Sequence, residues 1–81
     1  MKEIITDGIL DLKGIPCPRN SAQALIKLAG MNMGEILEII IDDGEPIENV
    51  PESIDEEDNY KIIRKRRGED NLWHLWVKVI R

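Results

Sequence analysis

The stretch Leu12-Lys13-Gly14-Ile15-Pro16-Cys17-Pro18-Arg19-Asn20 separates an apolar strand pattern from a helical pattern and holds the only cysteine of the chain. Gly14 and Pro16 are expected to end the strand, because both residues interrupt regular ladders. Pro18 suits the first position of a helix, where its missing N–H needs no partner. The sequence therefore predicts that Cys17 lies at or near the N-cap of a helix that directly follows the first strand.

The residues on either side of this stretch predict the strand and the helix themselves. The strand is expected to end near Lys13, and its apolar residues are Ile4, Ile5, Ile9, Leu10 and Leu12. The helix is expected to start at Pro18 and to end with Gly30 as its C-cap. Helical spacing predicts a side facing a sheet, formed by Ala22, Leu25, Ile26 and Ala29, and a solvated side formed by Arg19, Gln23 and Lys27.

The second half of the chain predicts three more strands and a weaker helix. A nearly continuous apolar run over 35–41 indicates a central strand. A helix is predicted over 46–57, in which Pro51 must lie in the first turn or break the helix. Strands are predicted over 60–66 and 72–80. In the last strand the inward-facing residues Trp73, Leu75, Val77 and Val79 are expected to alternate with the outward-facing residues His74, Trp76 and Lys78.

The predicted element order is βαβαββ. Because crossovers between parallel strands are right-handed, both helices are expected on one face of the sheet. The fold class predicted is therefore an α/β (α+β) two-layer sandwich with a mixed four-stranded sheet. A chain of 81 residues, 42% hydrophobic and 33% charged, fits one globular domain over 1–81.

Cysteine usage and charge bear on location and partners. The N-terminus has no apolar signal-peptide region, and no apolar run approaches the ~20 residues needed to span a bilayer. A lone cysteine cannot form an internal disulfide, so a cytoplasmic protein is predicted. The net charge is −5, with nine acids and no base over 42–58, and five bases and no acid over 61–67. The acidic side should repel nucleic acid, unless the basic side makes the contact.

The cysteine is the candidate reactive group. The carboxyl ends of the first two strands share an edge of the sheet, which places Asp42 and Asp43 on the same rim as Cys17. A helix N-terminus stabilises a thiolate, and its N–H groups can hydrogen-bond the anion. Arg19 is expected to add a nearby cation, while the two carboxylates would oppose the negative charge. Modest activation of the thiol is the expectation, and a small buried structural cysteine is the alternative.

A resemblance to a known family rests on several motifs, which are Leu10-Asp11-Leu12-Lys13-Gly14-Ile15-Pro16-Cys17-Pro18, the range 28–39, Asp42-Asp43 and, more faintly, Asn49-Val50-Pro51. These motifs resemble those of the SirA/TusA-like sulfur-carrier (sulfurtransferase) family. In this chain Asn20 stands where the family motif has a second proline. Asp58-Asn59 stands where many members have Gly-His.

The resemblance implies a function as well as a two-layer fold. By position, Cys17 would carry sulfane sulfur as a persulfide, and Pro18 would start the helix beside it. A cysteine desulfurase or another donor would load the sulfur, and an acceptor protein would receive it, in some members toward thiolation of tRNA. No cofactor is implied. A change in first-turn rigidity and in hydrogen bonding near the thiol is expected from Asn20.

Other features leave alternatives open. His74 is the only histidine and lies in the last strand, so neither a Cys–His hydrolase nor a zinc site is expected. The acidic run lacks the glycine and spacing of a calcium loop. The basic residues Arg64, Lys65, Arg66 and Arg67 could contact RNA phosphates, but a solvated hairpin end is favoured. A binding or regulatory module, with contacts through the acidic helix or Trp76, and a redox sensor acting through Cys17 are the alternatives to sulfur transfer.

Overall fold

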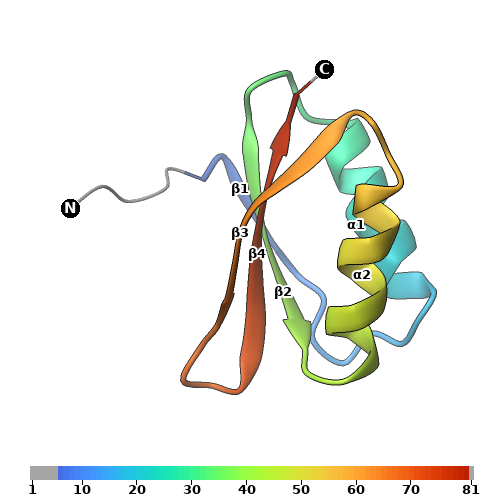
Figure 1. The fold of residues 1–81 in the computed structure, drawn as a ribbon, viewed down its shortest axis with the longest axis vertical. Helices are drawn as coiled ribbons and strands as arrows, with labels where there is room; N and C mark the ends of the chain where they lie inside the picture. Colours follow the sequence, from blue (N-terminus) through green and yellow to red (C-terminus); the bar gives the residue numbers. More distant parts are fainter. Residues whose placement is uncertain (1–5, 81) are drawn as a thin grey trace.

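The computed structural model describes residues 6–80 and has the predicted element order. The elements are β1 (Gly8–Asp11), α1 (Arg19–Ala29), β2 (Ile36–Asp42), α2 (Glu45–Asp55), β3 (Tyr60–Arg67) and β4 (Leu72–Val79). Both helices cover the same face of one sheet, and the other face is open (Figure 1). The predicted α/β two-layer sandwich is therefore confirmed. The predicted contributions of Ile4 and Ile5 to the first strand lie outside the described residues.

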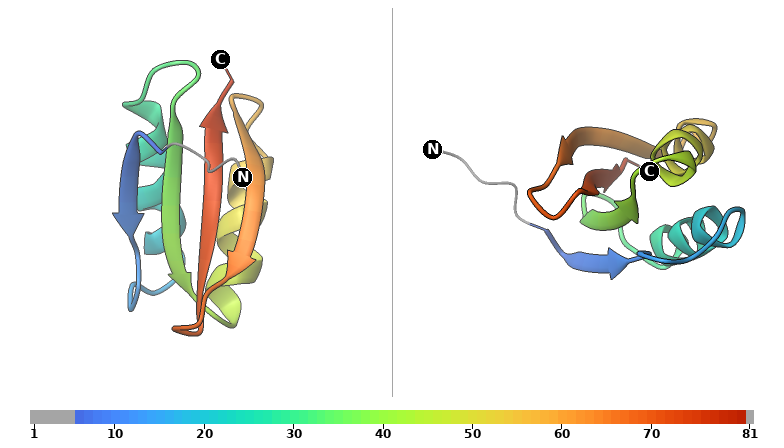
Figure 2. Two further views of the ribbon diagram at one scale, coloured as in Figure 1. Left: turned by 90° about the vertical axis from the view of Figure 1, so that its left-hand side faces the viewer. Right: turned by 90° about the horizontal axis from the view of Figure 1, so that it is seen from below.

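The sheet has the strand order β1-β2-β4-β3, and Figure 2 looks onto its open face in the left panel. β1 pairs with β2 in parallel, with Leu10 opposite Ile39. β4 pairs antiparallel with β2 and with β3. The parallel pair brings the carboxyl ends of β1 and β2 to the same edge of the sheet, at the bottom of Figure 1.

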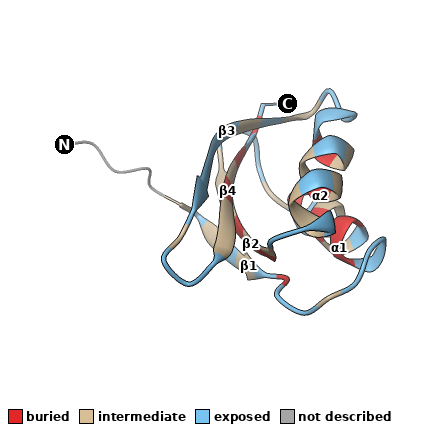
Figure 3. Ribbon diagram, turned by 60° about the horizontal axis from the view of Figure 1, so that its bottom comes forward, coloured by how far each residue is buried: buried red, intermediate tan, exposed pale blue. Residues whose placement is uncertain are grey.

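The hydrophobic core lies between the sheet and the two helices (Figure 3). Alternate residues of the two central strands point into it, as half-buried strands require. Its fully or almost fully buried members are Leu12, Ala24, Leu28, Leu37, Ile39, Ile41, Val50, Ile54, Leu75, Val77 and Val79. The predicted inward face of the last strand is confirmed, with Trp73 packed at its margin.

The predicted inward face of α1 is wrong. Ile26 is 72% exposed, and Ala22 and Ala29 are also exposed. The buried residues are instead Asn20, Ser21, Ala24 and Leu28, with Leu25 half-buried beside them. Both stripes have helical spacing and share Leu25. Apolar spacing alone selected the wrong one because the buried stripe begins with two polar residues.

This correction predicts different costs for two truncations on the same helix. Leu28→Ala removes a fully buried side chain and is expected to lower the free energy of unfolding by about 2–5 kcal/mol. Ile26→Ala should change it by less than about 0.5 kcal/mol, because that side chain is largely in water. Urea unfolding followed by circular dichroism measures both values. Equal losses would contradict the observed orientation of α1.

Two prolines behave differently from the prediction. α1 begins at Arg19, and Pro18 is its N-cap residue rather than its first helical residue. Pro51 lies inside α2 without ending it. A proline in a helix interior removes one hydrogen bond and costs about 3 kcal/mol. Burial of Val50 and Ile54 against the core offsets this cost, so α2 continues to Asp55. Neither described helix is long and apolar enough to cross a bilayer.

Candidate thiol site

Cys17 is exposed and lies in the loop between β1 and α1. This loop is the light blue segment at the lower edge of Figure 1, where both helices begin. The Cys17–Pro18 peptide bond is cis, and Pro18 caps α1. The prediction that the cysteine lies beside the start of the first helix is confirmed. The alternative of a buried structural cysteine does not fit its exposure.

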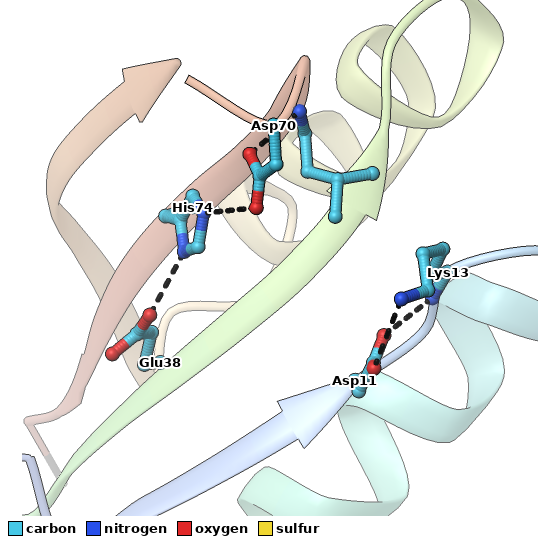
Figure 4. Close-up of polar contacts among 6 residues, drawn as sticks. Asp11, Lys13, Glu38, Asp70 and His74 are labelled. Carbon is cyan, nitrogen blue, oxygen red and sulfur yellow. Dashed lines mark hydrogen bonds and ion pairs between the residues drawn. The ribbon is translucent and has the colours of Figure 1, made fainter. Parts of the chain in front are cut away.

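The loop is tied to the ends of both parallel strands. Gly14 adopts a positive φ of 79° and donates its backbone N–H to Asp42 Oδ2 at 2.7 Å. Asp11 Oδ1 accepts from the Lys13 backbone N–H at 2.9 Å, and the two side chains form an ion pair at 3.9 Å (Figure 4). Asp42 therefore fixes the loop that presents the thiol, and no hydrogen bond between its carboxylate and the sulfur is present within residues 6–80.

Asn49 contacts the thiol from the second helix. Its side-chain Nδ2 donates a hydrogen bond to Cys17 Sγ at 3.6 Å, and no other hydrogen bond to this sulfur is present within residues 6–80. Asn49 lies in the second turn of α2, between the half-buried Ile47 and the buried Val50. An amide N–H favours negative charge on a nearby sulfur. The packing of α2 beside α1 thus brings a hydrogen-bond donor to the exposed thiol.

Sequence reasoning missed this contact. In the sequence, Asn49 is part of a motif near the second helix, and nothing in its spacing connects it with a cysteine 32 residues earlier. The one available signal was a polar side chain on a helix that must pack close to the start of the first helix.

Two backbone donors at the start of α1 have partners close by in the chain. The backbone N–H of Asn20 donates to Pro16 O at 3.1 Å, and that of Ser21 donates to Asn20 Oδ1 at 2.7 Å. These two N–H groups are therefore not directed at the thiol. Asn20 is fully buried, and its Nδ2 has no hydrogen-bond partner among the described residues. Its Oδ1 accepts from the Ser21 N–H in the first turn, and no hydrogen bond from Asn20 to the sulfur is present within residues 6–80.

The charged residues predicted near the thiol, Arg19, Asp42 and Asp43, do not form a group around the sulfur. Arg19 is exposed, and the described part of the chain shows no ion pair for it. Asp43 lies on the predicted rim but contacts the β3–β4 hairpin. Trp73 Nε1 donates to Asp43 Oδ1 at 2.9 Å, and Arg67 pairs with Oδ2 at 3.4 Å. Asp42 and Asp43 are thus structural anchors on two sides of one turn.

The Asp43 contacts predict a pH-dependent contribution to stability. The hydrogen bond from Trp73, followed by one from the Gly44 backbone and the charge of Arg67, lowers the pKa of Asp43 below its ordinary value of 3.8. A carboxyl whose pKa is lowered by folding stabilises the protein above its unfolded pKa. That stability is lost as the pH falls through the folded pKa.

Asp43→Asn is therefore expected to lower the Tm at pH 7, by an amount that shrinks below about pH 4. Thermal melts between pH 2.5 and 7 measure the difference from the unmodified protein. Asp58→Asn, in an exposed loop position, is the control and should change the Tm little. A pH-independent difference for Asp43→Asn would contradict the ionic origin of the effect.

The basic run Arg64, Lys65, Arg66 and Arg67 does not form one patch. The strand register pairs Arg64 with Trp76 and Arg66 with His74, on the open face of the sheet. Lys65 and Arg67 pair with Leu75 and Trp73 and thus lie on the opposite side, where Arg67 already binds Asp43. Alternation along β3 divides the run between two surfaces.

Comparison with known proteins identifies the family of this fold and site. The model of the family described as "Sulfurtransferase TusA" matches residues 8–79, which include both the thiol loop and the open sheet. The chain belongs to the TusA family of sulfur carriers. The family suggested by the motifs around Cys17 is thereby confirmed.

Individual relatives agree with this assignment. The chain is 31% identical over 77 residues to a protein of Archaeoglobus fulgidus named "Putative sulfur carrier protein", covering 95% of this chain and 86% of the relative. It is 39% identical over 51 residues to YedF of Escherichia coli, which bears the same description, covering 63% of this chain and 66% of YedF. The crystal structure of a SirA-like protein from Desulfitobacterium hafniense has the same fold, with a TM-score of 0.77, 15% identity and coverage of 91% and 99% of the two chains.

Proposed function

We propose that this TusA-family protein carries one sulfane sulfur as a persulfide on Cys17. The observation that carries the proposal is an exposed thiol beside the start of α1, with the Asn49 amide 3.6 Å from its sulfur. Sulfur transfer between proteins requires a thiolate that a second protein can touch, and it requires no deep pocket. Exposure of Cys17 at the edge of the domain meets this requirement.

Loading would proceed by thiol exchange at sulfane sulfur. The Cys17 thiolate attacks the outer sulfur of a persulfide on the donor protein, and a new bond forms between Sγ and that sulfur. The sulfur–sulfur bond of the donor breaks, and the donor cysteine leaves as a thiolate. In the second step an acceptor thiolate attacks the same sulfur, and Cys17 leaves as a thiolate. Neither step needs an external oxidant, a metal or a cofactor.

The Asn49 amide would stabilise the negative charge on sulfur both before and after loading. Its Nδ2 stabilises the Cys17 thiolate before loading. The added sulfur then lies about 2.05 Å from Sγ and carries the charge. The Asn49 side chain reaches Sγ from α2. A rotation of this side chain would be enough to bring Nδ2 within hydrogen-bond distance of the added sulfur. The contact thus stabilises the Cys17 thiolate when it attacks the donor persulfide and again when it leaves in the transfer to the acceptor.

The partners proposed are a donor such as a cysteine desulfurase and an acceptor protein of a sulfur relay, with thiolation of tRNA as one destination. A reducing cytoplasm would keep the single thiol free. The charge around the site also suits particular partners. α2 holds Asn49 and carries an acidic surface that includes Glu45, Glu48, Glu52 and Asp55. Donor and acceptor proteins are therefore expected to present basic surfaces around their own cysteines.

The test uses a cysteine desulfurase and cysteine as the sulfur source. Intact-mass measurement should show the addition of one sulfur atom, which dithiothreitol removes. Thiosulfate with a rhodanese is a second source. Absence of uptake from either source, in protein whose Cys17 still reacts with an alkylating reagent, would contradict the proposal and favour a binding module.

A further inference from the structure

The open face of the sheet carries a group of cations together with two aromatic side chains. The register places Lys61 opposite Lys78, Arg64 opposite Trp76 and Arg66 opposite His74. Trp76 and His74 alternate in β4 with the buried Leu75, Val77 and Val79, so they face away from both helices. We define Lys61, Arg64, Arg66, His74, Trp76 and Lys78 as the open-face cluster.

None of the four basic residues of this cluster forms an ion pair with another residue of the described range 6–80. Within residues 6–80 the ion pairs involve only Lys13, Arg67 and His74 among possible cations. Lys61 and Lys78 also lie directly across from each other, and like charges in this position destabilise a sheet. The open face also carries Glu38, opposite Trp76, but this carboxylate and that of Asp70 are bonded to His74 rather than to the four cations. The β3 side of the face therefore stays basic at some cost in stability, although the net charge of the chain is −5. Such a face suits an anionic ligand.

The two rings are fixed in position on the central strand β4. The His74 and Trp76 rings stack with centroids 6.1 Å apart and planes inclined by 25°. Glu38 Oε2 holds His74 Nδ1 at 2.9 Å, and Asp70 approaches Nε2 at 3.7 Å (Figure 4). The Arg64 guanidinium lies 5.3 Å from the centroid of the Trp76 ring. Planar groups are thus pre-arranged among cations, and none of them belongs to the core.

We propose that the open-face cluster binds single-stranded nucleic acid. The four cations would contact phosphates, and the His74, Trp76 and Arg64 planes would stack with bases. An acidic protein segment would satisfy the charges alone, whereas a nucleic acid strand uses both the charges and the flat groups. The acidic α2 lies on the other side of the sheet, where it repels a bound strand least (Figure 1). The Cys17 loop lies outside this face, so this site is independent of sulfur transfer.

The test is fluorescence anisotropy with labelled 12-nucleotide oligouridylate and oligothymidylate at 20 and 150 mM KCl. Arg64→Gln/Arg66→Gln should weaken binding at least tenfold and reduce the slope of log K against log salt by about 1.4, or about 0.7 for each lost phosphate contact. Lys27→Gln/Lys65→Gln changes the net charge equally on other surfaces and should stay within about twofold of the unmodified protein. Trp76→Leu should weaken binding by about fivefold or more.

Circular dichroism melts of each variant establish that it is folded. The proposal is overturned if the unmodified protein binds neither oligonucleotide at 20 mM KCl, or if both double variants lose binding equally. It is also overturned if polyglutamate or heparin binds as tightly as the oligonucleotides and Trp76→Leu has no effect. That last result would identify the face as a site for acidic proteins or for polyanions in general. Sulfur loading of Cys17 should be unchanged in Arg64→Gln/Arg66→Gln.

Discussion

Cys17→Ser is expected to abolish sulfur uptake completely. A serine hydroxyl is protonated at neutral pH and forms no persulfide, and the chain has no second thiol to replace it. The side chain at position 17 is exposed, and among the described residues its sulfur accepts one hydrogen bond, from Asn49 Nδ2. Folding should therefore be almost unaffected, with a change in the free energy of unfolding below about 0.5 kcal/mol. Intact mass after incubation with a desulfurase and cysteine measures uptake, and urea unfolding measures stability.

Two outcomes would contradict this expectation. Sulfur uptake by Cys17→Ser would place the carrier function elsewhere. Oxidant-driven dimerisation through Cys17 in the unmodified protein, without sulfur uptake from any donor, would instead support a redox sensor. A Cys17→Ser protein that fails to fold would contradict the position assigned to the residue, because an exposed loop side chain carries little of the stability.

Asn49→Asp is expected to slow the reactions of Cys17 by at least tenfold. The substitution keeps the size of the side chain, but it replaces the N–H donor 3.6 Å from the sulfur with a carboxylate oxygen. A hydrogen bond to a charged group is worth about 1.5–3 kcal/mol, or roughly ten- to 150-fold in an equilibrium constant. The added negative charge opposes the thiolate further. Rates of alkylation by iodoacetamide and of sulfur loading, both at pH 7, measure the effect.

Two matched variants separate the hydrogen bond from the charge. Asn49→Ala removes the donor without adding charge and should give an intermediate rate. Asn32→Asp makes the same chemical change in the exposed turn before β2, at the far end of the domain, and should leave both rates within about twofold. If Asn49→Asp reacts as fast as the unmodified protein, the amide has no role in stabilising the sulfur anion.

Much of the fold could be predicted because each element carries a local signal. Alternation from Trp73 to Val79 identified β4 and its inward face, and the apolar run before Asp42 identified the central strand. The inward face of α1 could not be predicted by counting apolar residues, since burial favoured Ser21 and Ala24 over Ala22 and Ile26. The continuation of α2 through Pro51 also depended on tertiary packing, which offset an unfavourable local preference.

At the candidate site, too, local features could be predicted and contacts between elements could not. The position of Cys17 beside the first helix followed from a glycine, two prolines and a change of period, all within one short stretch. The contact between Asn49 and Cys17 could not be predicted. The two residues are 32 positions apart, and the contact depends on how closely α2 packs beside the start of α1. The separate anchoring roles of Asp42 and Asp43 required the strand register and the position of Trp73. Side-chain partners across elements are properties of packing, which a single sequence specifies only indirectly.

The most direct measurement follows radioactive sulfur onto the protein and off it again. The protein is loaded from [35S]cysteine by a desulfurase, purified without reductant, and then incubated with an acceptor thiol. The account predicts about one labelled sulfur per chain, confined to the peptide that contains Cys17, and its transfer to the acceptor with release of a free Cys17 thiol. Label that is absent, attached elsewhere, or retained on Cys17 in the presence of excess thiol would contradict the claim that this cysteine is a sulfur carrier.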